Sequence, residues 1–402
     1  MSLNHYPIIA IGASIASISF IRTLRAHEDQ RQILLIHGED RLPYKRTKIN
    51  KNMVRGFDKD DFKMADEQWY FDNNVELIYD RALDLNPEEK TVHTKKGNVY
   101  YYDKLLLATG ASAVIPKISG VDSKEIHGVQ NAKDVDDVLD ASVGKERFLI
   151  IGGGVEGIET ADQLVRKGKQ VVIASRMKLP LQKLFPETLL NELVKKINAK
   201  GVHLFNGVSV SNITKKDEHY EVTLKGQKLR FDVIIACTGA VPNIDLARKA
   251  ELKVERGILV NEYLQTSDKD ILAAGDVAQH NRGVVTGLWH AAEHQGELAA
   301  LYILGKPQKH DLPPFRLKTD VFGLFMFSGA YEEMIPGAYE AKEERYGDVH
   351  RIMYYSDNQL KSVVFINDKN RAKTYQQALF EQWDKAKVAS ELPLPPKISF
   401  AF

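Results

Sequence analysis

The chain has 402 residues, of which 44% are hydrophobic and 27% charged, and its formal net charge is +1. This length allows two or three domains with separate cores, and the composition is ordinary for a globular protein. A net charge near zero, without a long block of Lys and Arg, argues against a nucleic-acid partner. The single cysteine, Cys237, excludes an intrachain disulfide, a Cys-x-x-Cys pair and a four-cysteine metal site.

The apolar run 7–20 is the first feature that could suggest a membrane segment or a signal peptide. It is interrupted by Gly12 and three serines, and it lacks the basic flank of a signal peptide. We therefore expect no membrane partner and a cytoplasmic location.

The N-terminal part reads as a βαβ unit, with strand 7–12, helix 14–26 and strand 32–37. Its turn, Gly12-Ala-Ser14-Ile-Ala-Ser17, resembles a degenerate dinucleotide-binding turn with two serines in place of glycines. Serine is small, and its hydroxyl can hydrogen-bond a phosphate. Glu39 lies about 20 residues beyond the turn, the offset of a ribose-binding acid. Asp40 is the neighbouring alternative, and an ordinary loop carboxylate is the other interpretation of Glu39.

A second and stronger nucleotide turn begins near residue 150. The predicted strand 147–151 leads into Gly152-x-Gly154-x-x-Gly157, and helix 155–167 and strand 170–174 follow. The first glycine allows a tight bend, the second a close approach of the backbone to a pyrophosphate, and the third close packing of helix and strand.

The end of this second unit bears on the choice of nucleotide. Ser175, followed by Arg176, stands where an acid normally binds a ribose hydroxyl. A missing acid beside a cation favours NADPH over NADH, whereas Arg176 as a plain surface residue leaves the choice open.

The remaining predicted elements follow in chain order. They are a basic irregular segment (43–51), strands 98–102 and 104–107, a crossover (111–147), helix 187–199, strand 202–205, hairpins within 208–232, strands 233–236 and 271–274, helix 287–304, short strands within 318–367 with a hairpin at Asp357-Asn358, and a helix at 370–387. Both halves contain an apolar strand followed by Thr-Gly, at Thr109-Gly110 and at Thr238-Gly239, which indicates an internal duplication.

These motifs together resemble the FAD-dependent pyridine nucleotide–disulfide oxidoreductase superfamily, as does the segment ILAAGDVA at 271–278. Pro43-Tyr44-x-Arg46-x-x-x-x-Lys51 and Trp289-x-x-Ala292-x-x-Gln295-Gly296 are similar to its branch of rubredoxin and ferredoxin reductases, nitrite reductase flavin domains and apoptosis-inducing factor. Thr47, Lys48 and Asn50 depart from the branch's usual Pro, Pro and Ser.

The resemblance implies an α/β fold with two Rossmann-like nucleotide-binding domains and a C-terminal α+β domain. The FAD domain would comprise 1–114 and 239–313, the NAD(P)H domain 115–238, and the last domain 314–402. Two roles stay open for the last domain: a homodimer interface, or a cover over the flavin.

The resemblance also implies roles for individual residues. Asp276, with Gly275 beside it, would bind the FAD ribityl hydroxyls, and Arg46 the FAD pyrophosphate or adjacent groups. Lys51 would lie beside the flavin and pair with Glu159, because a lysine in a dry site needs a counterion and its charge stabilises the anionic reduced flavin. Trp289 would flank the isoalloxazine or the nicotinamide. Taken alone, Trp289 also fits a core aromatic and Lys51 a solvated loop lysine.

The implied activity is electron transfer from NADH or NADPH through FAD to an iron–sulfur protein such as rubredoxin or ferredoxin. A redox disulfide is not expected, because helix 14–26 and segment 43–51 contain no cysteine and Cys237 ends a buried strand. The alternatives are an NAD(P)H oxidase that uses dioxygen, and a flavoprotein whose nucleotide state controls partner binding. Basic residues within 45–51 and 166–183 would offer an acidic carrier a docking surface.

Overall fold

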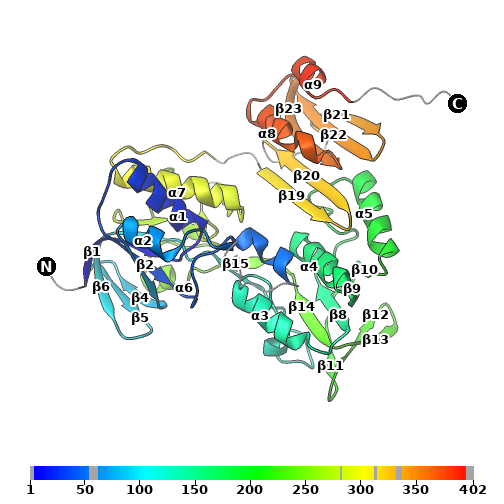
Figure 1. Cartoon of the computed structure of the whole chain (residues 1–402), viewed down its shortest axis with the longest axis horizontal. Helices are drawn as coiled ribbons and strands as arrows, with labels where there is room; N and C mark the ends of the chain where they lie inside the picture. The colour runs from blue at the N-terminus through cyan, green and yellow to red at the C-terminus, as the bar shows by residue number, and fades with distance from the viewer. Residues whose placement is uncertain (1–3, 54–61, 281–282, 312–314, 332–336, 395–402) are drawn as a thin grey trace.

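The computed structural model describes residues 4–53, 62–280, 283–311, 315–331 and 337–394. It has an α/β fold with a mixed sheet, a parallel sheet and a C-terminal antiparallel sheet (Figure 1). The first sheet has seven strands in the order β3-β2-β1-β6-β5-β4, with β17 paired to β6. Their bounds are β1 His5–Ile11, β2 Ile33–His37, β3 Val75–Tyr79, β4 Ala82–Asn86, β5 Thr91–Thr94, β6 Val99–Leu107 and β17 Ile271–Ala273.

The parallel part of this sheet has the doubly wound order of nucleotide-binding folds. Strands β1 and β2 are almost wholly apolar and buried, as strands covered on both faces are. Helices α1 (Ile15–Ala26) and α7 (Trp289–Ile303) pack against each other along the sheet (Figure 1).

The single strand β6 spans Val99–Leu107, so the prediction of two strands here was wrong. The polar pair at its centre does not break the strand, because Asp103 pairs with His5 and Lys104 pairs with Asp270.

The second sheet has four parallel strands in the order β10-β9-β8-β14. Their bounds are β8 Arg147–Ile151, β9 Gln170–Ser175, β10 His203–Asn206 and β14 Val233–Ala236. Helices α4 (Val155–Arg166) and α5 (Glu187–Ala199) follow β8 and β9. The predicted hairpins are confirmed as an antiparallel sheet of β11 Thr214–Lys215, β12 Tyr220–Leu224 and β13 Gln227–Phe231.

The crossover 111–147 contains a helix that the sequence analysis did not predict, α3 (Ala132–Ala141). It begins with a capping box, in which the Asn131 side chain accepts from the Asp134 amide and Asp134 reaches back to the cap. The sequence pattern that marks this helix start, Asn-x-x-Asp, was therefore present.

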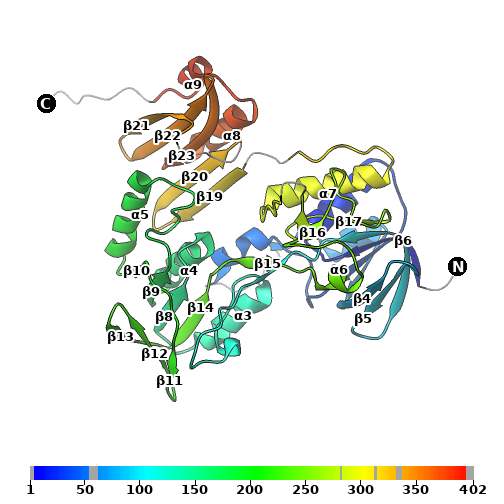
Figure 2. The same ribbon diagram turned by 180° about the vertical axis from the view of Figure 1, so that it is seen from behind.

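Two crossovers connect the parallel sheets, and they pair with each other. Strand β7 (Ala111–Ala113) is antiparallel to β15 (Ala240–Pro242), and this ribbon lies between the two halves (Figure 2). Because β17 belongs to the first sheet, that sheet is built from segments on both sides of the second in the sequence. The boundaries proposed for the three domains stay predictions.

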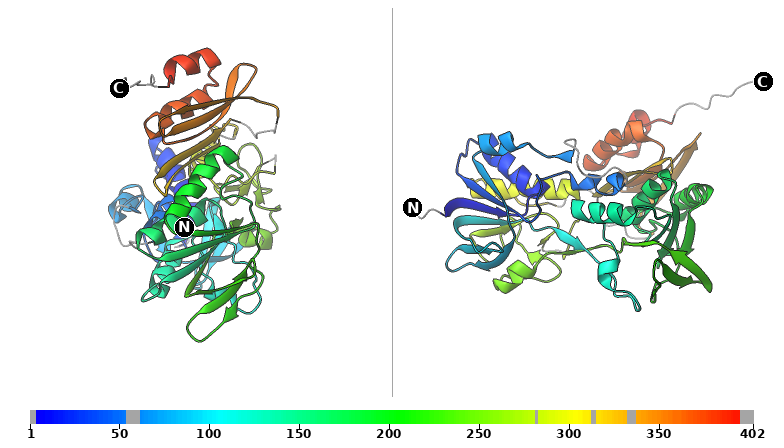
Figure 3. Two further views of the ribbon diagram at one scale, coloured as in Figure 1. Left: turned by 90° about the vertical axis from the view of Figure 1, so that its right-hand side faces the viewer. Right: turned by 60° about the horizontal axis from the view of Figure 1, so that its bottom comes forward.

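The last part is a five-stranded antiparallel sheet in the order β19-β20-β23-β22-β21, seen at the top of Figures 1 and 2 and from two further sides in Figure 3. Its strands are β19 Phe315–Val321, β20 Leu324–Ala330, β21 Glu340–Tyr346, β22 Val349–Ser356 and β23 Gln359–Ile366. One face packs against α8 (Ala372–Phe380), and the other shares a core with α4. The hairpin at Asp357-Asn358 is confirmed, with φ values of 48° and 65° that fit a type I′ turn.

The single helix predicted at 370–387 is wrong, because two helices occupy this segment. Helix α8 ends at Phe380, Gln382 takes a positive φ of 48°, and α9 spans Lys385–Glu391. Buried Trp383 anchors the turn, and the Asp384 side chain caps α9 by accepting from the Lys387 amide at 2.7 Å.

Other short elements are α2 Glu67–Asp72, α6 Asp245–Lys249, β16 Ile258–Leu259, β18 Ala278–Gln279, and the 3₁₀ turns η1 Arg46–Lys48, η2 Asn50–Asn52, η4 Ser123–Glu125 and η5 Lys369–Arg371. Among the residues that the structure describes, no helix has the length and apolar character needed to cross a membrane.

Candidate functional site

The two glycine turns occupy equivalent places, each at the carboxyl end of a parallel strand. Gly12 follows β1 with φ of +100°, and Gly152 follows β8 with φ of +127°. A Cβ on Gly12 would lie 2.1 Å from the Ala108 carbonyl oxygen, and one on Gly152 would lie 2.0 Å from that of Cys237. Each turn therefore packs against the residue that precedes a Thr-Gly pair, which gives the internal duplication a structural basis.

The second turn leaves open space at the start of a helix. Gly157 packs on the Gly152 carbonyl oxygen, 2.2 Å from where its Cβ would stand. Gly154, in contrast, has φ of −76°, and a Cβ there would meet nothing within 4 Å. It is the N-cap of α4 and supplies no side-chain cap, so the first helical amides have no side-chain acceptor there. Such a helix start fits a dinucleotide pyrophosphate.

The first turn divides its two serines between different tasks. Ser17 is fully buried and donates to the Gly12 carbonyl oxygen at 2.5 Å, so its one proton stabilises the turn. Ser14 is the N-cap of α1 and makes no side-chain cap bond. Of the two predicted serines, Ser14 is thus the one whose hydroxyl is left to meet a phosphate.

Asp276 follows β17 and offers its carboxylate to this first unit. Burial raises the pKa of Asp276, while the nearby Arg46 opposes that rise. No described residue donates a hydrogen bond to this carboxylate. The turn before it is fixed, because the Gly275 amide donates to Gln295 Oε1 at 2.6 Å. A half-buried carboxylate held in this way fits the hydroxyls of a bound flavin nucleotide.

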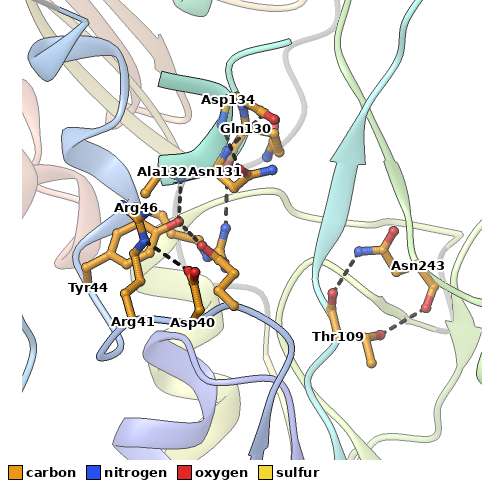
Figure 4. Close-up of polar contacts among 11 residues, drawn as sticks. Asp40, Arg41, Tyr44, Arg46, Thr109, Gln130, Asn131, Ala132, Asp134 and Asn243 are labelled. Atoms are coloured by element: carbon orange, nitrogen blue, oxygen red, sulfur yellow. Dashed lines mark hydrogen bonds and ion pairs between the residues drawn. The ribbon is translucent and has the colours of Figure 1, made fainter. Parts of the chain in front are cut away.

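Arg46 and Glu39 form an ion pair in the same region. Figure 4 shows Arg46 beside Ala132, at the start of α3. The Tyr44 hydroxyl donates to Glu39 Oε2 at 2.7 Å and accepts from the Ala132 amide at 2.8 Å. Arg46 also donates to the Gln130 carbonyl oxygen at 3.3 Å. Both Glu39 oxygens are therefore already engaged, and a ribose hydroxyl would add to these bonds. The sequence analysis missed Tyr44, because its partner lies on the unpredicted helix.

Lys51 and Glu159 meet as the sequence analysis predicted, with 4.0 Å between Nζ and Oε1. Glu159 is only 8% exposed, and it also accepts from Thr319 Oγ1 at 2.7 Å and from Asn50 Nδ2 at 3.4 Å. Two segments that are distant in the sequence, the turn η2 and β19, thus converge on one carboxylate of α4. Thr319 was not found from the sequence, because nothing local in β19 reveals a contact with α4.

The two Thr-Gly pairs lie in the crossover ribbon. Thr109 Oγ1 donates to the Asn243 carbonyl oxygen at 2.9 Å, as Figure 4 shows, and Thr238 Oγ1 donates to that of Val114 at 2.6 Å. Both hydroxyls thus join the crossovers to each other. Cofactor contacts from these pairs, including Gly110 and Gly239, stay predictions.

Ser175 and Arg176 lie at the end of β9, beside the second turn. Ser175 is buried, and its Oγ accepts from the Met177 amide at 3.1 Å. Arg176 is exposed and has no ion-pair partner among the described residues. A cation with this placement fits a ribose 2′-phosphate.

Trp289 and Cys237 differ in their burial. Trp289 is the first residue of α7 and is only partly buried against the first core, so its place beside the flavin or the nicotinamide stays a prediction. Cys237 is 5% exposed, and burial raises the pKa of its thiol, so it is a core residue and not a reactive thiolate.

Comparison with known proteins agrees with this geometry. Residues 6–296 match the model of the family described as pyridine nucleotide-disulphide oxidoreductase. The chain is 27% identical over 401 residues to the assimilatory nitrate reductase electron transfer subunit of Bacillus subtilis, which covers 98% of this chain and 51% of that protein. It is 30% identical over 300 residues to the NADH-rubredoxin oxidoreductase of Clostridium acetobutylicum, which covers 74% of this chain and 75% of that one.

A solved structure of NADH:rubredoxin oxidoreductase from Clostridium acetobutylicum superposes with a TM-score of 0.76 at 25% identity, over 94% of this chain and 96% of that one. The chain spans about half the length of the two Bacillus subtilis relatives it matches, at 51% and 46%.

Proposed function

This chain belongs to the pyridine nucleotide-disulphide oxidoreductase family, and we propose that within it the chain passes electrons from NAD(P)H through FAD to a small iron–sulfur protein. The observation that carries the proposal is the ion pair of Lys51 with Glu159, which joins the segment after the first nucleotide unit to the helix that follows the second turn, with no accessible thiol among the described residues. Dinucleotide chemistry is supported, and an internal disulfide is not available as the electron acceptor.

The residues divide into two binding sets. Gly12, Ser14, Arg46 and Asp276 would hold FAD. The turn from Gly152 to Gly157, with Arg176, would hold NAD(P)H. When bound, FAD supplies hydride acceptance from the nicotinamide and release of electrons to an acceptor.

Lys51, Glu159 and Trp289 are proposed to lie at the junction of the two sites. Lys51 places a cation there, and Glu159 fixes it through an ion pair that Thr319 and Asn50 hold in position. The partly buried indole of Trp289 offers a flat surface for ring packing.

An acidic carrier is supported by a basic edge on β19 and α8, made of Arg316, Lys318 and Lys373. Burial lowers the pKa of Lys318, and the charges of the other two residues lower it further. These three residues have no ion-pair partner among the described residues. Like charges held together without a counterion favour an acidic protein surface as the partner.

Reversing the charge of Lys318 tests this surface. Lys318→Glu is expected to lower kcat/KM for the carrier by about tenfold at low salt, with the difference shrinking as salt rises. The rate of flavin reduction by nicotinamide should not change. Lys200→Glu is the matched control, because Lys200 is an exposed lysine at the end of α5. Equal losses in both variants would contradict a docking role for the basic edge.

The acceptor itself is tested by turnover with purified rubredoxin, ferredoxin or dioxygen under each nicotinamide. Rapid reduction of one carrier supports the proposal. Rapid turnover with dioxygen that no carrier changes would instead favour an NAD(P)H oxidase. Very slow turnover with a long-lived nucleotide complex would favour a redox-responsive binding flavoprotein.

The nucleotide preference depends on Arg176. If its guanidinium binds a 2′-phosphate, Arg176→Ala is expected to lower kcat/KM for NADPH by about 10- to 100-fold and to leave NADH unaffected. The control is Lys200→Ala. Helix α5 leads into the parallel strand β10, so its C-terminal end lies at the amino ends of the strands, whereas the turn lies at their carboxyl ends. A similar small loss for both nucleotides would identify Arg176 as a plain surface residue.

A further inference from the structure

One carboxylate in the first turn of α4 has no hydrogen-bond or ion-pair partner among the residues that the structure describes. Glu156 is the second residue of α4, two positions after Gly154, and it is partly buried. No described residue donates a hydrogen bond to it or forms an ion pair with it. Glu159, one turn later on the same helix, is in contrast held by Lys51, Thr319 and Asn50.

The groups that face Glu156 come from three elements. They are Glu159 on α4, Asp276 after β17 and Cys237 after β14. Burial, with the charges of Glu159 and Asp276, raises the pKa of Glu156 to about 7. Cys237 adds no charge, because burial raises the pKa of its thiol. The nearby cations are engaged elsewhere, Lys51 with Glu159 and Arg46 with Glu39.

The position of Glu156 follows from these neighbours. It lies on the helix that starts at the NAD(P)H turn, and it is near enough to Asp276, of the proposed FAD unit, for the charge of Asp276 to act on it. Provided that the proposed function is correct, a nicotinamide that extends from the pyrophosphate at Gly154 toward the flavin passes this carboxylate.

We propose that Glu156 is a specificity-determining residue that makes the site prefer oxidised over reduced nicotinamide. The oxidised ring carries a positive charge and the dihydro ring is neutral, so an unpaired carboxylate in a poorly solvated site attracts only the oxidised form. The preference is present when the carboxyl is ionised and is lost when it is protonated. It favours electron flow from nicotinamide toward the flavin.

The test compares NAD⁺ with the redox-inactive 1,4,5,6-tetrahydro analogue of NADH, which carries a neutral ring. Calorimetry on the FAD-loaded protein gives both affinities one pH unit below and one above the pKa of about 7. The ratio of NAD⁺ to analogue affinity is expected to rise about tenfold between these two conditions, as the ionised fraction does. Glu156→Gln should abolish this rise and keep the affinity for the analogue. Glu187→Gln, an exposed acid in the first turn of α5, should behave like wild type.

A second measurement on the wild-type protein does not depend on the folding of a variant. Binding of NAD⁺ at the lower pH should release a proton, and binding of the analogue should not, as the buffer dependence of the binding enthalpy reports. A ratio that does not change with pH, or that rises equally in Glu156→Gln, would overturn the inference alone. Failure to bind both dinucleotides and also their 2′-phosphorylated counterparts would overturn the proposed function as well.

Discussion

Gly154→Val is expected to leave the chain folded and loaded with FAD, but to slow its reduction by NADH or NADPH by about 10²-fold, equivalent to about 2.7 kcal/mol. Gly154 has φ of −76°, which any L-residue adopts, and the space around its Cβ position is empty to 4 Å. The valine side chain would fill that space beside the first amides of α4. A dinucleotide pyrophosphate would then lose its closest approach to the helix start.

The matched variant for this prediction is Gly152→Ala. There the added Cβ would stand 2.0 Å from the Cys237 carbonyl oxygen on a backbone with φ of +127°, so the fold itself must give way. We expect a lower Tm for Gly152→Ala. For Gly154→Val we expect only a small loss in the free energy of unfolding, about 1 kcal/mol, because the N-cap is poorer. Stopped-flow reduction and thermal unfolding of both variants separate the two effects. If the flavin of Gly154→Val were reduced at the wild-type rate, the pyrophosphate would have to bind elsewhere.

Lys51→Met is expected to lower the flavin reduction potential and to slow reduction by the nicotinamide about 10- to 100-fold. The Lys51 side chain is 42% exposed. Its ion pair with Glu159 therefore contributes about 1–3 kcal/mol to stability, less than a fully buried pair would. Its removal leaves the Glu159 carboxylate, 8% exposed, without a cation beside the proposed flavin site. A negative charge on the reduced flavin is then less well stabilised.

Companion variants separate this electrostatic role from a structural one. Lys51→Arg should restore most of the potential, because it keeps the charge. Lys51→Met with Glu159→Gln should recover part of the loss, since the charge of Glu159 is removed together with that of Lys51. The potential is measured by anaerobic reduction against a reference dye, with unfolding followed in parallel. A potential that is unchanged in Lys51→Met would place this lysine away from the flavin.

Local sequence patterns predicted the parts of the site that local geometry determines. The turn from Gly152 to Gly157 could be found because its glycines serve the bend and the helix start next to them. The pairing of Lys51 with Glu159 is present, although the segment around Lys51 departs from the branch pattern. Here the resemblance supplied what spacing alone could not, since 108 positions (159 − 51) separate the two residues.

The features that were missed depend on contacts between distant segments. Thr319 reaches Glu159 across 160 positions, and Tyr44 reaches the Ala132 amide across 88. The sequence pattern of β19 and of the basic segment 43–51 does not indicate either contact. The break between α8 and α9 was missed for a related reason: buried Trp383 fixes it by tertiary packing, while the local composition continues to favour helix.

The central claim is that one chain brings NAD(P)H and FAD together for electron transfer to an external acceptor. Its most direct test is anaerobic titration of the purified protein with NADH and with NADPH while the visible absorption of the flavin is recorded. We expect FAD to be present, about one nicotinamide per flavin to bleach it, and an added iron–sulfur carrier to restore the absorption. A protein without FAD, or a flavin that stays oxidised with both nucleotides, would contradict it.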